Sequence, residues 1–382
     1  MFSQAVMRMI DRSRMAIGLV IILAAAAAGC GGPSLRAQDA VKVGMLAPLN
    51  SGVPAAARAA VQGATLAVEE INSNGGVGGA SITLVVQDDR GNVEEATRQF
   101  DALVAQRVVA IVGPLTDATA IGVAPMAERA GIVLVSPGAT GTIPYAGSSF
   151  FRTALPAEAQ ARALAEFAVQ TKRTRRISII QDGNEYGTLV ALAFSQRVRA
   201  LGGEIVGTRL YKDGHTDFSR HATGVVADGA DAVLIAGYPD EGALILAALK
   251  NRGARVTMLG SDALYSTDLL SWARGATDDL YLPAAFAASE PLPAVQEFVT
   301  KYRRRFSETP DHFAAQGYDA VKMVAFAVRK NGSSPAAIRT ALQGLRRFPG
   351  VTGEITLDRW GAPARPVGIA RVRVGQFELV RR

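Results

Sequence analysis

"VVAIVGPLTDATA" occupies residues 108–120 and combines the two patterns that decide the fold. The apolar run 108–112 predicts a buried β-strand, which stops at Gly113-Pro114. Polar residues follow, among them Asp117, and a helical pattern begins over 118–129. α/β proteins place ligands where a strand runs into a helix in this way. Asp117 is therefore a helix cap, a catalytic acid or a ligand contact, and the rest of the chain has to decide.

The same alternation of strand and helix extends on both sides of this corner. The strands expected in the first half are 41–47, 81–87, 108–112 and 131–135, and the helices between them are 61–71, 92–106 and 118–129. After "FFRTALP" (150–156) the pattern repeats, with strands at 177–181, 204–210, 231–237 and 256–260 and helices at 158–170, 187–201 and 241–251. Alternation of this kind predicts two α/β halves, each a doubly wound parallel sheet with helices on both faces.

The C-terminal third does not repeat the plan. Helical patterns cover 292–306, 313–329 and 336–346, and residues 353–382 look like strands with polar turns. Surplus helices followed by surplus strands indicate that the chain crosses back between the two halves.

The N-terminus has the features of an export signal. Arg8, Arg12 and Arg14 precede the apolar stretch 16–28, which is short for a membrane span. The stretch ends in "AAGC", so residues 1–29 are expected to be a signal peptide and 30–40 a tether. Cys30 is the single cysteine, which rules out an intrachain disulfide.

The "AAGC" ending resembles the bacterial lipobox, whose cysteine is lipidated. Ala27 stands where the lipobox usually has leucine. An ordinary signal peptide with an incidental cysteine at position 30 remains the alternative to a lipid anchor.

Composition and motifs argue against several classes of protein. The net charge is +7 and the basic groups "TKRTRR" (171–176) and "KYRRRF" (301–306) are expected to be solvated faces, not a nucleic-acid surface. The three histidines, His215, His221 and His312, lack metal-ligand spacing. No dinucleotide, phosphate-loop or nucleophile-elbow motif is present. We therefore expect no cofactor, no metal site and no enzymatic activity.

Several motifs, taken in order, resemble the branched-chain amino-acid type of solute-binding protein that serves ABC importers. They run from about residue 41 to 360: "AVEEINSNGGVGGASITLVVQDD" (67–89), "VVAIVGPLTDATA" (108–120), "GIVLVSPGAT" (131–140), "ISIIQDGNEYG" (177–187), "DAVLIAGYPDEG" (231–242), "MLGSD" (258–262) and "GYDAV" (317–321). The resemblance implies the type I periplasmic-binding fold, in which two doubly wound lobes are joined by three crossovers and close over a ligand. The implied hinges lie near 153–157, 283–288 and 350–353. Lobe one is then 41–153 plus 286–350, and lobe two is 154–285 plus 351–382.

The resemblance also implies a ligand site. In lobe one, the ligand carboxylate would meet Leu115, Thr116 and Asp117 at the first corner and free N–H groups of the "SPGAT" turn at the second, through Gly138, Ala139 and Thr140. In lobe two, Tyr186 and Tyr238 would cover the apolar part of the ligand and hydrogen-bond to it. Asp262 would accept the ligand ammonium, unless it is only a turn or capping residue.

Two positions depart from the family pattern. Ala56 and Ala57 stand where many relatives carry an aromatic residue, and nearby Arg58 either reaches the ligand or points to solvent. Asp117 stands where a carboxylate-binding serine is usual. As a helix cap it would stabilise the helix, but as a ligand contact it would place negative charge beside a ligand carboxylate.

The expected function is therefore the binding of an amino acid or a related small polar solute for import. The expected partner is an ABC permease in the inner membrane, with the protein exported to the periplasm and held there by a lipid anchor. A sensor of the same fold and an exported enzyme on an α/β scaffold are the alternatives.

Overall fold

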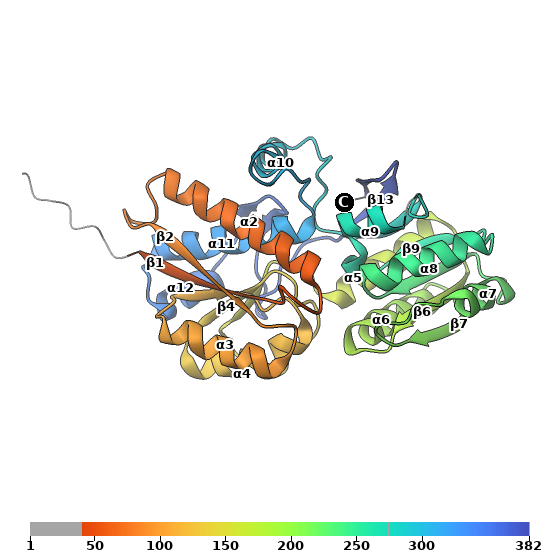
Figure 1. Ribbon diagram of the computed structural model, residues 1–382, viewed down its shortest axis with the longest axis horizontal. Coiled ribbons are helices and arrows are strands. Elements are labelled where there is room, and N and C mark those ends of the chain that lie inside the picture. The colour runs from red at the N-terminus through yellow and green to blue at the C-terminus, as the bar shows by residue number, and fades with distance from the viewer. Residues whose placement is uncertain (1–39, 274, 382) are drawn as a thin grey trace, which may run out of the picture. The chain divides into compact units, whose positions relative to one another are not determined.

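The computed structural model describes residues 40–273 and 275–381 (Figure 1). The expected signal peptide, tether and lipidated Cys30 lie outside the described residues. Residues 40–382 form one compact unit of the chain.

The first half of the chain builds a five-stranded, wholly parallel sheet in the order β2-β1-β3-β4-β5. Its strands are β1 (Val41–Ala47), β2 (Ile82–Asp88), β3 (Ala110–Val112), β4 (Val133–Ser136) and β5 (Phe150–Arg152). Alternate residues of β1 face opposite sides of the sheet, so that Met45 and Leu46 lie in different hydrophobic cores. We call this sheet with the helices packed on it lobe one.

Helices cover both faces of the first sheet, as the alternating pattern predicts. One core lies under α2 (Pro54–Ser73), α10 (Pro293–Phe306), α11 (His312–Asn331) and α12 (Pro335–Gln343). The opposite core lies under α3 (Val93–Ala105) and α4 (Asp117–Ala130). The surplus C-terminal helices therefore belong to lobe one, although they follow lobe two in the sequence (Figure 1).

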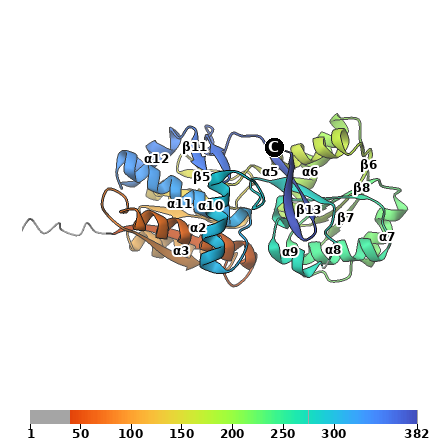
Figure 2. The same cartoon turned by 90° about the horizontal axis from the view of Figure 1, so that it is seen from above.

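The second sheet has seven strands in the order β14-β13-β10-β9-β8-β6-β7. It consists of β6 (Arg176–Asp182), β7 (Glu204–Tyr211), β8 (Ala232–Ala236), β9 (Thr257–Gly260), β10 (Leu280–Ala284), β13 (Gly368–Arg373) and β14 (Gln376–Arg381). The strands β6 to β10 are parallel, and the C-terminal β13 and β14 add an antiparallel edge. Figure 2 shows β13 in dark blue among the green elements of this half.

Helices also flank the second sheet on both sides, and together they make lobe two. The helix α5 (Ala157–Glu166), its continuation η1 (Phe167–Thr171) and α6 (Glu185–Ala200) lie over one core. The opposite core includes residues of α7 (Ser219–Ala227), α8 (Pro239–Asn251), the short η2 (Asp262–Leu264) and α9 (Thr267–Trp272). Two doubly wound α/β lobes are thus present, and the predicted fold class is confirmed.

The chain passes between the sheets three times. The first passage lies between β5 and α5, and the second follows β10, since Phe286 already packs in the core of lobe one. The expected third hinge at 350–353 is wrong. The hairpin β11 (Phe348–Gly350) and β12 (Gly353–Ile355) belongs to lobe one, because Val351, Ile355 and Leu357 are buried in its core.

The third passage lies further along the chain. The Arg152 amide donates to the carbonyl of Gly361 at 2.9 Å, and the Ala364 amide donates to the carbonyl of Thr356 at 2.8 Å. These bonds hold the chain against lobe one up to residue 364, and β13 begins at Gly368. We therefore propose that lobe one includes residues 351–364 and that lobe two resumes at β13.

Helices α2 and α11 touch through their backbones at two glycines. A Cβ atom on Gly63 would overlap the carbonyl of Ala314, and one on Gly317 would overlap the carbonyl of Ala60. Only glycine permits this approach, which brings two twenty-residue helices together over the first sheet.

Replacing Gly317 with alanine is expected to lower the free energy of unfolding by about 1–3 kcal/mol, because the added methyl group overpacks the contact. Gly344→Ala is the control, since a Cβ there meets only ordinary contacts at 3.7 Å or more. Chemical denaturation measures both variants. A Gly317→Ala protein as stable as the wild type would contradict the close packing of these helices.

Candidate functional site

The corner after β3 is held by Thr116, which is the residue that caps α4. Its side chain accepts a hydrogen bond from the Thr119 amide at 3.3 Å. Asp117 is the first helical residue, and its carboxylate points elsewhere. The interpretation of Asp117 as the helix cap is therefore wrong, because Thr116 fills that position.

The turn after β4 is tied to the first corner by buried Ser136. Its hydroxyl donates to the carbonyl of Pro114 at 2.5 Å and accepts from the amides of Ala139 at 2.9 Å and Gly138 at 3.4 Å. A Cβ on Gly138 would come within 2.5 Å of the carbonyl oxygen of Leu115, so only glycine lets the two corners approach.

Asp117 crosses from its helix to the same turn. Its Oδ1 accepts hydrogen bonds from the amides of Thr140 at 2.8 Å and Gly141 at 2.9 Å. The expectation of free N–H groups in the "SPGAT" turn is wrong in this structure, because Ser136 takes two of these amides and Asp117 takes the third.

Arg152, at the end of β5, holds the backbone of the turn that Asp117 contacts. It is buried and its Nη1 donates to the carbonyls of Gly141 at 2.9 Å and Ala139 at 3.3 Å. Burial raises the pKa of Asp117 above its ordinary value, whereas the two backbone N–H groups and the Arg152 guanidinium oppose that rise. The sequence reasoning missed both Ser136 and Arg152. One sign of Arg152 is visible in the sequence, because it is the charged residue of "FFRTALP", just before the chain first passes between the lobes.

In lobe two, Asp262 lies directly after β9 and is buried. The Tyr186 hydroxyl donates to its Oδ1 at 2.6 Å, and Gln160 Nε2 donates to its Oδ2 at 2.9 Å. The Ala263 amide in turn donates to the Tyr186 hydroxyl at 3.2 Å. Burial raises the pKa of Asp262, and the hydrogen bonds from Tyr186 and Gln160 oppose that rise. Both partners are neutral, so the carboxylate has donors but no cation among them. Nothing in the sequence pattern pointed to Gln160.

Tyr238 completes this group at the start of α8. Its ring stacks on that of Tyr186, with centroids 5.4 Å apart. Burial raises the pKa of Tyr238, and the negative charges of Asp117, Asp182 and Asp262 raise it further. The predicted residues of both lobes are therefore near enough for their charges to act on one hydroxyl group. The sequence-based site stays a prediction as a ligand site, but its members form one group in each lobe, held by hydrogen bonds in lobe one and by hydrogen bonds and ring stacking in lobe two.

Residues 40–376 match the family described as periplasmic binding protein. The chain belongs to the periplasmic binding protein family.

Several relatives of this periplasmic binding protein are described as amino-acid-binding proteins. The Leu/Ile/Val-binding protein BraC3 of Rhizobium johnstonii is 28% identical over 84% of this chain and 88% of its own. A leucine-, isoleucine-, valine-, threonine- and alanine-binding protein of Pseudomonas aeruginosa is 24% identical over 89% and 91%. The crystal structure of the branched-chain amino acid transporter substrate-binding protein LivJ of Streptococcus pneumoniae, in complex with isoleucine, superposes with a TM-score of 0.84 at 25% identity and covers 90% of this chain and 100% of that one.

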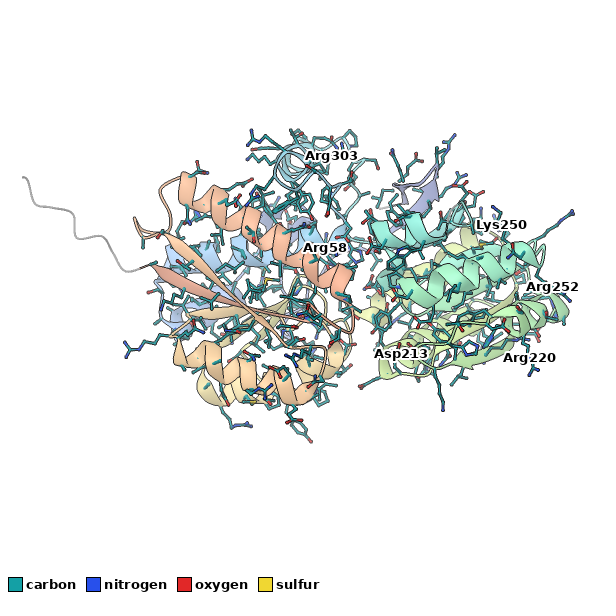
Figure 3. The ribbon with its side chains drawn as sticks, in the orientation of Figure 1. Arg58, Asp213, Arg220, Lys250, Arg252 and Arg303 are labelled. Atoms are coloured by element: carbon teal, nitrogen blue, oxygen red, sulfur yellow. The ribbon has the colours of Figure 1, made fainter. Side chains whose placement is uncertain are left out.

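Arg58 does not join the two groups in this periplasmic binding protein. Its guanidinium lies on α2, 3.6 Å from the Asp268 carboxylate of lobe two, and its side chain is 56% exposed (Figure 3). It lines a small recess with Tyr302, Glu308 and Asp311. The structure thus gives Arg58 an acidic partner outside the predicted ligand contacts.

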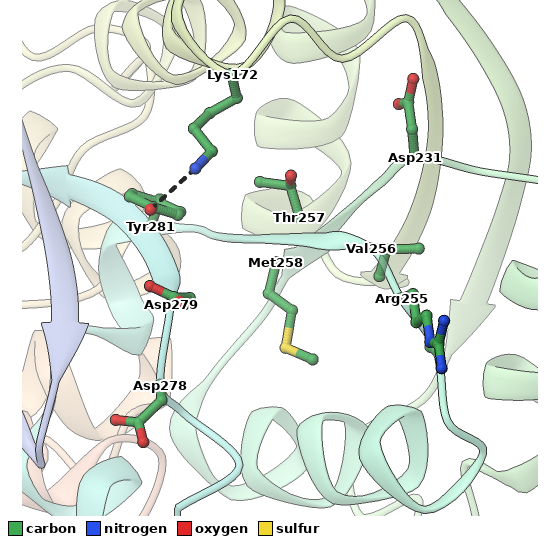
Figure 4. A pocket seen from close by; sticks show the side chains of 10 residues that line it. Lys172, Asp231, Arg255, Val256, Thr257, Met258, Asp278, Asp279 and Tyr281 are labelled. Atoms are coloured by element: carbon green, nitrogen blue, oxygen red, sulfur yellow. Dashed lines mark hydrogen bonds between the residues drawn. The ribbon is translucent and has the colours of Figure 1, made fainter.

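A hollow of about 350 Å³ lies where the parallel strands β9 and β10 of the second sheet begin (Figure 4). It is lined by the starting ends of β9 and β10, and Lys172 Nζ donates to the Tyr281 hydroxyl there at 3.1 Å. Asp262 and Tyr238 follow the opposite ends of strands in this sheet, so the hollow is separate from them.

Among the residues that the structure describes, no three histidine, cysteine, aspartate or glutamate side chains gather in a way that suits a metal ion. Within the same ranges, no helix is long and apolar enough to cross a membrane.

Asp311, beside Arg58, is a fully buried acid that caps α11 by accepting from the Ala314 amide at 2.9 Å. Burial raises its pKa to about 7. An unfolded aspartate titrates near pH ~3.9. Between these values the folded state holds a proton that the unfolded state has lost, so the free energy of unfolding falls as pH rises through this window.

Asp311→Asn is expected to remove this slope while keeping an oxygen that caps the helix. Relative to the wild type, the variant should gain stability from about pH 4.5 to 7.5, by up to roughly 1.4 kcal/mol per pH unit. Urea denaturation across this range measures the difference. Asp101→Asn, at an exposed site on α3, is the control. Parallel pH profiles for Asp311→Asn and the wild type would contradict the raised pKa.

Proposed function

We propose that this periplasmic binding protein is the extracytoplasmic solute-binding component of an ABC importer. Its ligand is an amino acid or a related small polar solute that carries an amine. The observation that carries the proposal is the buried Asp262 carboxylate, held by Tyr186 and Gln160 beside a second tyrosine.

The chemistry of this group suits an ammonium ion. Burial raises the pKa of Asp262 and so disfavours its ionised form, and a cationic ligand would supply the counter-charge that its neutral hydrogen-bond donors lack. The stacked rings of Tyr186 and Tyr238 offer apolar area for the rest of the solute, and their hydroxyl groups supply hydrogen bonds. On this proposal Asp262 binds the ammonium and the two tyrosines cover the ligand.

The proposal includes transport and location. Closure of lobe one and lobe two over the solute would present a surface that the permease recognises. The relatives named above are described as binding proteins and as a transporter component, which favours import over sensing. Residues 1–29 would direct export to the periplasm and Cys30 would carry a lipid anchor, which mass spectrometry of membrane-extracted protein would detect as an added mass.

A thermal-shift screen of amino acids, amino-acid amides, simple amines, urea-like compounds and aromatic acids tests the proposal. A true ligand at 100 times its Kd should raise the free energy of unfolding by about 2.7 kcal/mol. Absence of any stabilising compound at millimolar concentration would contradict the binding function. An altered ligand recovered after incubation would instead indicate an enzyme.

Asp262→Asn is expected to weaken binding of any amine-bearing ligand by roughly 2–5 kcal/mol, because the ammonium loses its buried counter-charge. The asparagine oxygen can still accept a hydrogen bond from the Tyr186 hydroxyl, whereas its amide group replaces the oxygen that accepts from Gln160. Isothermal titration with the ligand from the screen measures the loss. Glu204→Gln is the control, since Glu204 is an exposed partner of Arg176 in the same lobe. Unaltered affinity in Asp262→Asn would rule out the ammonium contact.

A further inference from the structure

We infer that Asp117 supplies, from the protein itself, the carboxylate that an amino-acid ligand would otherwise bring, and that the protein selects small ammonium compounds lacking a free carboxylate. The inference deepens the proposed function and rests on it. It concerns which solutes fit between Asp117 and Asp262.

The contacts of Asp117 lie wholly within lobe one. Its Oδ1 accepts from two successive amides, Thr140 at 2.8 Å and Gly141 at 2.9 Å. Paired backbone N–H groups that converge on one oxygen are a usual anion-binding arrangement. Here the anion is the side chain of Asp117 itself. Because the acid and both amides belong to lobe one, these hydrogen bonds do not depend on lobe two.

Neighbouring residues are fitted to the Asp117 carboxylate. A Cβ atom on residue 141 would lie 2.5 Å from Asp117 Oδ2, so the glycine there leaves the space that the carboxylate fills. Arg152 donates to the carbonyls on either side of Thr140 and places a buried positive charge near the acid. The amides, the glycine and the arginine together hold a carboxylate in this place.

The remaining amides of the turn are also occupied. Ser136 accepts from Gly138 and Ala139, so the "SPGAT" turn has no unpaired amide from 138 to 141. A ligand carboxylate would have to displace Asp117 or lie next to it. Two like charges about 4 Å apart, at an effective dielectric constant near 20, disfavour that complex on the order of a hundredfold or more.

The charges of the two lobes define the ligand class. Asp117 has its N–H donors and Arg152, whereas Asp262 has the neutral donors Tyr186 and Gln160. Asp262 is therefore the acid that lacks a cation among its partners, and one ammonium group would stabilise its ionised form. A monocation with a neutral remainder, such as an amino-acid amide, an ester or a simple amine, balances this site, and a zwitterion does not.

Matched acid and amide pairs test the inference without any mutation. L-Leucine and L-leucinamide share a side chain and an amine, and further pairs based on glycine, alanine and phenylalanine vary the size. Titration calorimetry at about pH 6.5 keeps the α-amino groups charged, since they titrate near pH ~8. The wild type should bind the amide at least about tenfold more tightly than the acid in every pair that binds.

Variants at residue 117 then identify the cause. Asp117→Ser is too short to reach the Thr140 and Gly141 amides, so it should free them, strengthen binding of the acids and reverse the preference. Asp117→Asn keeps an accepting oxygen without the charge and should give an intermediate ratio. Glu128→Gln removes a carboxylate from the far end of the same helix and should leave the wild-type ratio unchanged.

The outcomes separate this inference from the proposed function. If the wild type binds acids as tightly as amides, Asp117 does not exclude carboxylates, although the protein still binds solutes. If neither series binds, the ligand found in the broader screen decides. A ligand with a free carboxylate overturns the inference, and an amine without a carboxylate supports it. If no compound binds at all, both proposals fail. Should a variant fail to fold, the wild-type ratio alone decides.

Discussion

The hydrogen bonds from the Thr140 and Gly141 amides to Asp117 join the corners that follow β3 and β4 of the first sheet. They use the donors that a bound anion would otherwise attract, and they bring a buried negative charge to that place. Two neighbours accommodate this contact. Arg152 places a positive charge near the Asp117 carboxylate, and the glycine at 141 leaves the space that the carboxylate fills. The ligand class that we propose follows from the same contact, because a site that already contains an anion favours a cation.

The two lobes contribute unlike halves of the site. Lobe one offers an acid whose charge is balanced by the protein, and lobe two offers Asp262 with neutral partners under a pair of stacked tyrosines. Each half is complete within its own lobe, since the hydrogen bonds of Asp117 and Asp262 do not cross between them. The difference between the halves is one of charge compensation, which fold similarity to amino-acid binders does not reveal.

Much of this architecture was predictable because apolar periodicity reports burial directly. Most long strands and helices of both lobes were predicted to within a few residues, although α2 begins seven residues before the expected helix 61–71. The corner at Thr116 and Asp117 was located from its change of pattern. The three-residue β5 was missed because it is too short for alternation to appear, and β10 because proline interrupts it. The late third passage was missed because residues 351–357 have a strand pattern that fits either sheet.

The direction of side chains was not predictable in the same way. The sequence located Asp117 at a helix start, where a cap and a ligand contact look alike. Only the structure shows that Thr116 caps the helix while Asp117 reaches the turn after the neighbouring strand β4. Gln160 acts on Asp262 from 102 positions away in the chain, a distance over which local pattern carries no information. Long-range hydrogen bonds of this kind decide which charges are left for a ligand.

A crystal structure of the wild-type protein grown with both L-leucine and L-leucinamide in excess would show which of the two solutes the site selects. We expect the amide, with its ammonium on Asp262 and with Asp117 still accepting from Thr140 and Gly141. A ligand carboxylate seated on those two amides, with the Asp117 side chain turned away, would contradict this expectation.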